Sequence, residues 1–160
     1  MPAWDDFFLA QAGASASLAG LLFVGISLNM KRIIAVPALP NVALRALGLF
    51  ATVFVVSSVM LVPGQTNLAV GIELLVAVAG SSFVITWLTY QVLRLSEVQY
   101  LRGSQAGLVA ILTVSGVYLG GALFILDGLG TGVYLLVGPA IASILLALMD
   151  SWVLLIEINR

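Results

Sequence analysis

The feature that most constrains this chain is a series of apolar stretches, each close to the length that a helix needs to cross a lipid bilayer. Five such stretches follow one another, at residues 7–30, 42–62, 68–93, 106–126 and 133–156. About 20 apolar residues in a helix span the hydrocarbon core of a membrane. Because 62% of all residues are hydrophobic and only 8% are charged, the chain lacks the polar groups that cover a soluble domain. We therefore expect an all-α integral membrane protein, with five transmembrane helices in a compact bundle that forms a single domain over residues 1–160.

The charged residues divide between the two sides that five alternating helices define. Cytoplasmic loops are enriched in Lys and Arg. We therefore expect the N-terminus outside, the C-terminus in the cytoplasm and a location in a cell inner membrane. The alternative is four spans, with residues 7–30 lying along the membrane interface. Both ends of the chain would then lie on one side, and the basic residues would no longer all fall on the same side. All six basic residues fall on one predicted side, which has Lys31, Arg32, Arg45, Arg94, Arg102 and Arg160, whereas the other has Asp5, Asp6 and Asp127.

Composition also excludes several kinds of chemistry. The chain has no Cys and no His, which removes disulfides, thiolate metal sites and histidine general bases. Phosphate-loop, dinucleotide-binding and EF-hand patterns are absent from the sequence as well. A formal net charge of −1 gives no reason to expect a nucleic-acid partner. We therefore expect a protein that is not an enzyme, binds no metal ion or cofactor, and is surrounded by the lipid bilayer.

Two ionisable residues are predicted to lie in the cytoplasmic half of the membrane. Arg45 lies about one turn inside its helix and Asp150 about two turns from the end of the last helix. Their depths then differ by only a few Å, at about 1.5 Å per residue. They can form an ion pair, within one chain or between chains. The alternative is that Arg45 extends to the lipid headgroups while a nearby Ser or Asn caps Asp150.

The last apolar stretch also carries a small and polar face. Helical spacing places four residues on it, Ser143, Ala147, Asp150 and Glu157. Pro139 lies near the same face and is expected to bend the helix, because proline removes a backbone hydrogen bond. This face is either a packing surface, as small-residue faces usually are in lipid, or the lining of a hydrated cavity.

Glu73 is predicted to lie about two turns below the outer end of its helix, where the sequence offers no basic residue to pair with it. Ionisable side chains in a membrane usually face protein or water. One alternative is a neutral Glu73 that is hydrogen-bonded to a neighbour, for which Gln11 lies at a similar depth. The other is a ring of Glu73 side chains around an oligomer axis, which would attract cations or relay protons. Glu73, Gln11, Asp150 and Arg45 are therefore the candidate pore or ion-interacting residues.

Small residues predict close contacts between helices and a homo-oligomer. The first stretch contains six consecutive small residues, 12–17, and the fourth contains a GxxxG spacing. The candidate packing residues are Gly13, Ser17, Gly20, Gly80, Gly116 and Gly120.

One face of the first stretch combines small and polar residues. Helical spacing places four residues on it, Gln11, Ser15, Gly25 and Asn29. We expect this face to point inward, toward Glu73 near the outer end and toward Arg45 or Asp150 near the inner end.

The string GLLFVGISLN, at residues 20–29, follows a helix start of small residues and precedes a basic pair. It resembles the first helix of small, uncharacterised multi-pass inner-membrane proteins of bacteria, a resemblance that implies no catalytic residues. We expect an oligomeric membrane protein that forms a small ion channel or transport path through its intramembrane carboxylates. The alternative is a non-conducting accessory or regulatory subunit of another membrane complex, such as a protease, a transporter or a secretion machinery. Its partner would then be another membrane protein.

Overall fold

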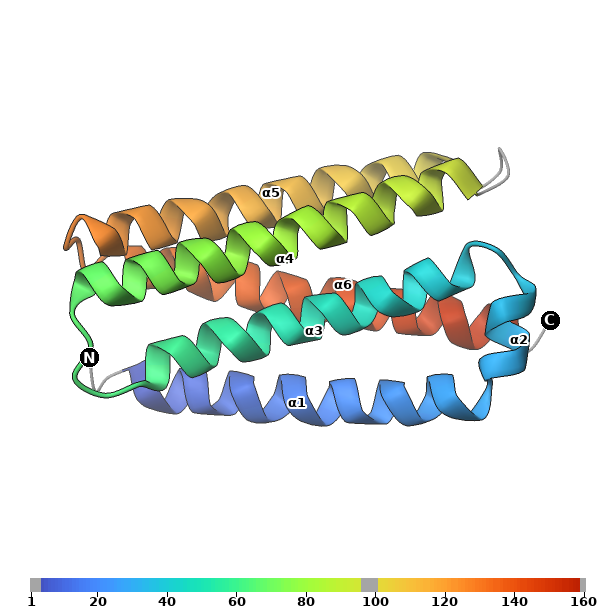
Figure 1. Cartoon of the computed structure of the whole chain (residues 1–160), viewed down its shortest axis with the longest axis horizontal. Coiled ribbons are helices and arrows are strands. Elements are labelled where there is room, and N and C mark those ends of the chain that lie inside the picture. The colour runs from blue at the N-terminus through green and yellow to red at the C-terminus, as the bar shows by residue number, and fades with distance from the viewer. Residues whose placement is uncertain (1–3, 96–100, 159–160) are drawn as a thin grey trace.

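The chain forms a bundle of long helices in a computed structural model that describes residues 4–95 and 101–158. Within these residues the regular structure is entirely helical. The six helices are α1 (Asp5–Leu28), α2 (Met30–Ala35), α3 (Leu39–Leu61), α4 (Asn67–Leu95), α5 (Leu101–Leu126) and α6 (Gly132–Ile158). The five long helices lie side by side, and the short α2 lies at one end of the bundle (Figure 1). Each long helix is long and apolar enough to cross a membrane.

The central element of the bundle is α3, which packs against α1, α4 and α6. Within the apolar part of each helix, 50% of the residues are buried in α3 but only 11% in α1. The helix α5 packs against α4 and α6 and has no contact with α1. The helix α1 runs along the bundle beside α3 (Figure 1).

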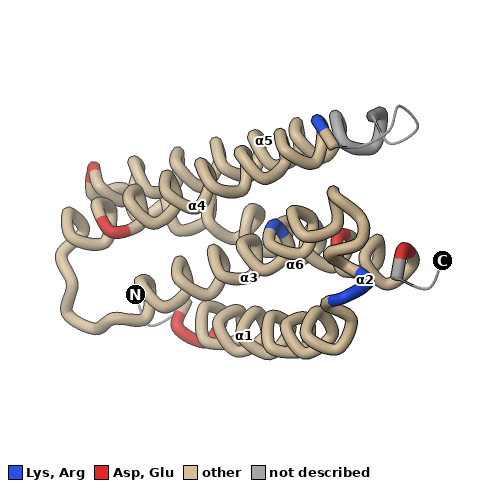
Figure 2. The backbone as a smooth tube through the Cα atoms, turned by 45° about the vertical axis from the view of Figure 1, so that its right-hand side comes forward, with Lys and Arg blue, Asp and Glu red and all other residues tan. Residues whose placement is uncertain are grey.

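The two ends of the bundle differ in charge. The start of α1 and the end of α6 lie at opposite ends of the bundle (Figure 1). Basic residues lie toward the end that holds α2, whereas acidic residues lie at both ends (Figure 2). Lys31 and Arg32 belong to α2, and Arg94 lies in the last turn of α4. Arg160 is outside the described residues, and only the backbone of Arg102 is described.

The connection after α1 is partly helical, which differs from the expectation. The first long helix ends at Leu28, and the connection contains the six-residue helix α2. Ile33 anchors α2 against the bundle, with only 2% of its surface exposed. The helix ends before Val36, which is extended at φ −111° and ψ 115°. Pro37 explains this end, because a proline disfavours the helical conformation of the residue before it.

The other predicted stretches agree with the helix bounds to within about three residues, except that α5 begins at Leu101 rather than at residue 106. Pro139 lies inside α6, and the helix continues through it. Two short connections contain a glycine with positive φ, Gly64 at 74° between α3 and α4 and Gly128 at 78° between α5 and α6. Glycine adopts this backbone conformation at little steric cost, which permits both turns.

Candidate functional site

An ion pair between Arg45 of α3 and Asp150 of α6 lies inside the bundle. The guanidinium donates from Nε to Oδ2 over 2.8 Å and from Nη2 to Oδ1 over 2.6 Å. Such a two-point contact is the strongest and most directional form of ion pair between side chains. Each side chain is only 12% exposed. The predicted pairing is therefore confirmed within one chain, and the alternative in which Arg45 extends to the headgroups is wrong.

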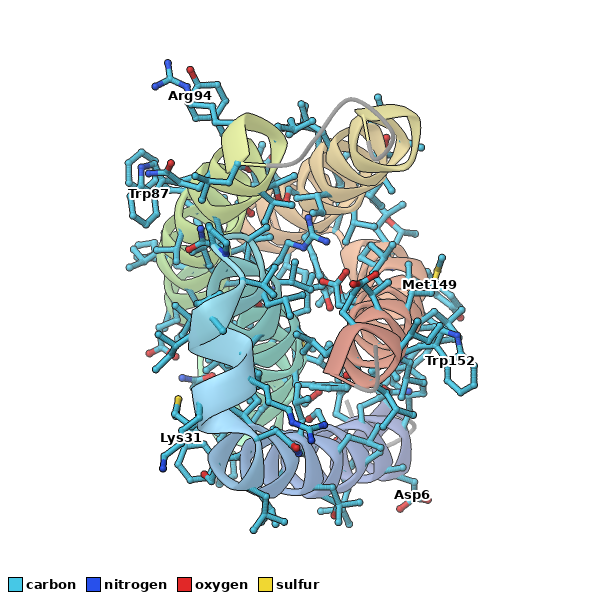
Figure 3. All side chains as sticks on the ribbon, turned by 90° about the vertical axis from the view of Figure 1, so that its right-hand side faces the viewer. Asp6, Lys31, Trp87, Arg94, Met149 and Trp152 are labelled. Atoms are coloured by element: carbon cyan, nitrogen blue, oxygen red, sulfur yellow. The ribbon has the colours of Figure 1, made fainter. Side chains whose placement is uncertain are left out.

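The packing of α3 against α6 brings these two side chains together. Ala46, next to Arg45, and Ala147, one turn before Asp150, are both 0% exposed. Small side chains allow two helices to approach closely. Figure 3 looks along the bundle from the end that holds α2 and shows Met149 and Trp152 pointing away from the neighbouring helices. Asp150, which lies between them in the sequence, is only 8% exposed and is therefore the inward residue of this turn.

The pair can be broken in two chemical ways. A proton on Asp150 removes the negative charge, and an anion bound to Arg45 replaces the carboxylate. Either event would remove a contact that joins α3 to α6.

The polar face of α6 is turned into the bundle. Ser143 is 1% exposed and Ala147 is 0% exposed, Pro139 is buried on the same side, and Glu157 is half-buried. The interpretation of this face as a packing surface is therefore confirmed at Pro139 and Ala147. A small cavity nevertheless lies beside Ser143.

Glu73 lies near the start of α4 on the exposed surface of the chain. Its Oε2 accepts a hydrogen bond of 2.8 Å from Nε2 of Gln65, which belongs to the loop before α4. The suggested partner Gln11 is wrong, because α1 and α4 have no contact with each other. Gln65 lies eight residues before Glu73 in the sequence. The sequence alone does not predict this hydrogen bond, because it depends on how the loop before α4 turns back toward the helix.

The small and polar face of α1 points partly as expected. Ser15 is 0% exposed. Gly25 and Asn29 line an apolar groove of about 290 Å³ between α1 and α6, together with Ser151. The inward direction is therefore confirmed near the end that holds Asp150. The expected approach to Glu73 is wrong, because α3 lies against α1 and α4 does not.

The predicted packing glycines do not pack within the chain. A Cβ atom added at any of them would meet no heavy atom within 4 Å, a set that comprises Gly13, Gly20, Gly80, Gly116 and Gly120. Ser17 is also exposed. The prediction is therefore wrong for contacts inside one chain, and packing of these residues against another chain stays a prediction.

Three other glycines provide the close contacts inside the bundle. A Cβ atom at Gly71 of α4 would lie 2.8 Å from the Cα of Leu126. A Cβ atom at Gly132 would lie 2.7 Å from the carbonyl oxygen of Gly121, where α5 and α6 meet. Gly121 directly follows the GxxxG spacing, but spacing alone does not indicate which side of a helix meets its neighbour.

Arg45 and Asp150 therefore combine charge, burial and defined geometry in one site. Comparison of the chain with protein-family models, with curated proteins and with solved structures finds no match.

Proposed function

We propose that the chain is an oligomeric protein of a cell inner membrane that provides a path for a small ion or polar solute. In this proposal the five long helices cross the bilayer, with the N-terminus outside and the C-terminus in the cytoplasm. The grouping of Lys31, Arg32 and Arg94 toward one end supports this orientation, because basic residues are enriched on the cytoplasmic side. The resemblance of residues 20–29 to bacterial inner-membrane proteins agrees with this location.

The observation that carries the proposal is the buried ion pair of Arg45 and Asp150. Ionisable side chains within membrane-spanning helices are costly and commonly mark ion pathways or proton relays. Glu73, at the other end of the bundle, is the second candidate station. It is exposed on a single chain, so it contributes to a path only where neighbouring subunits enclose it.

The ion pair acts as a closed gate in this proposal. Ala46, Leu49 and Ala147 are at most 3% exposed and fill the layer next to the pair. A solute that crosses within one subunit has to displace this layer. Protonation of Asp150, or an anion on Arg45, releases α6 from α3 and permits the displacement. Transport is therefore expected to depend on pH or on the anion present.

A second candidate function is that of a non-conducting accessory subunit of another membrane complex. The open glycines on outward surfaces favour it, because small residues let a foreign helix approach closely. Gly13 and Gly20 lie on α1, Gly80 on α4 and Gly116 on α5, and none has a neighbour within 4 Å of an added Cβ. The same surfaces suit copies of this chain, so purification has to distinguish the two.

Two experiments test these functions. The chain is purified in mild detergent and its mass is measured under native conditions, and a homogeneous homo-oligomer supports the transport path. A stoichiometric foreign membrane protein supports the accessory function instead. The oligomer is then placed in liposomes with the wild-type chain or with Glu73→Gln. If Glu73 is a station, this substitution changes ion flux or its pH dependence while the oligomer persists, and unaltered flux removes Glu73 from the path.

A further inference from the structure

A small cavity lies between α3, α4, α5 and α6, away from the Arg45–Asp150 pair. Thr52 lies seven residues from Arg45 on α3, and Ser143 lies seven residues before Asp150 on α6. The cavity is therefore about 10 Å along the helices from the pair, at about 1.5 Å per residue. Six of its lining residues carry a hydroxyl group, Thr52, Ser81, Ser82, Ser115, Tyr118 and Ser143.

Two of these hydroxyls are buried without a partner. Tyr118 and Ser143 are each 1% exposed. Tyr118 Oη and Ser143 Oγ lie beside each other, but among the described residues neither makes a hydrogen bond of acceptable geometry. A buried hydroxyl that is left unpaired is destabilising, and buried polar groups in proteins are usually satisfied by protein or by an ordered water molecule.

Two other hydroxyls of the cavity have used their proton. Thr52 Oγ1 donates to the carbonyl oxygen of Gly48 over 2.8 Å, and Ser81 Oγ donates to that of Val78 over 3.1 Å. Their oxygen atoms retain lone pairs that can accept a hydrogen bond. Tyr118 and Ser143 retain a proton to donate. These four hydroxyls thus offer two acceptors and two donors, the complement of the two donors and two acceptors of one water molecule, and Ser82 and Ser115 add two further hydroxyls to the lining.

The size of the cavity limits which ligand can bind in it. It leaves about 10 Å³ for the centre of a water-sized sphere, which is about the least that a buried water molecule requires. A hydrated ion or an organic solute is larger. The residues that line the cavity include no carboxylate that would favour a bare cation.

We propose that this cavity binds one water molecule, which accepts hydrogen bonds from Tyr118 and Ser143 and donates to Thr52 and Ser81. The water joins the four helices α3, α4, α5 and α6 at a point remote from the ion pair. Its binding does not depend on whether the protein conducts ions.

The test begins with Tyr118→Phe, which removes one hydroxyl and keeps the aromatic ring. With the water bound, the substitution breaks a hydrogen bond and lowers the midpoint of thermal unfolding, by about 2–4 °C for a chain of this size. Without the water, Tyr118→Phe removes a hydroxyl that has only the Ser143 hydroxyl beside it, without good hydrogen-bond geometry, and the midpoint should not fall. Tyr134→Phe is the control, because Tyr134 is 66% exposed and its substitution should leave the midpoint unchanged.

Solid-state NMR of the wild-type protein in lipid bilayers gives the direct measurement. Transfer of magnetisation from water to the side chain of Ser143 is expected, and Tyr118→Phe should weaken it. Ser143→Ala should lower the unfolding midpoint as well. The double substitution should lower it by less than the sum of the single effects, since both remove the same water. An unchanged or higher midpoint in Tyr118→Phe, or no transfer to Ser143 in the wild-type protein, overturns the proposal.

Discussion

Removal of one partner from the Arg45–Asp150 pair should destabilise the bundle more than removal of both. Asp150→Leu leaves a guanidinium that is only 12% exposed without the carboxylate that accepts its two hydrogen bonds. Breaking a buried ion pair in this way costs about 3–5 kcal/mol. We expect about 3 kcal/mol, the lower value, because polar groups also find partners in a chain that is unfolded within a membrane.

The double variant Arg45→Met with Asp150→Leu removes both charges and fills similar volume. Its free energy of unfolding should lie within about 1 kcal/mol of the wild-type value, because an apolar pair avoids the desolvation of two ions. The assay is reversible unfolding in mixed micelles by titration with sodium dodecyl sulfate. Arg94→Met is the control, because Arg94 is exposed. Its guanidinium carbon lies 4.5 Å from the ring centre of Tyr90, a contact worth about 0.5–1 kcal/mol at an exposed site, so the loss should be much smaller than in Asp150→Leu. If the free energy of unfolding of Asp150→Leu lies within about 1 kcal/mol of the wild-type value, the two side chains are not a tightly coupled buried pair.

Two further predictions concern packing and use the same unfolding assay. Gly71→Ala should lower the free energy of unfolding by about 1–3 kcal/mol, because its Cβ meets the backbone of Leu126 at 2.8 Å. Gly80→Ala on the same helix has open space and should be neutral or stabilising, so an equal loss in both contradicts the close contact. Ile33→Ala should cost about 2–5 kcal/mol, since Ile33 is 2% exposed, whereas Ile34→Ala at a 64% exposed position should have little effect. Equal effects of the two isoleucine substitutions would argue against the docking of α2.

The features that follow from helix geometry were predictable from the sequence. The long apolar stretches indicated the five long helices because few charges interrupt them. The similar depth of Arg45 and Asp150 was predictable, since the rise per residue converts sequence position into position along the bundle, whereas the choice between their pairing and the headgroup alternative needed the structure. The inward direction of Ser143 and Ala147 followed from the helical period.

The order of the helices around the bundle was not predictable in the same way. Periodicity states which residues share a face, but it does not state which neighbour that face meets. For this reason Gln11 was assigned to the surroundings of Glu73, although α1 packs beside α3 and away from α4. The close glycines Gly71 and Gly132 were missed for the same reason. The short helix α2 depends on a tertiary contact of Ile33, which local sequence does not reveal.

The measurement that tests the proposed path most directly is ion flux into liposomes that contain the purified oligomer, recorded across a range of pH. Wild-type protein is compared with Asp150→Asn and with the exchanged pair Arg45→Asp and Asp150→Arg. If the ion pair is the gate, the wild-type protein conducts, Asp150→Asn changes the flux or its pH dependence, and the exchanged pair restores part of the closed behaviour. Absence of flux from the wild-type protein at every pH, or identical flux in all three proteins, would contradict a path controlled by Arg45 and Asp150.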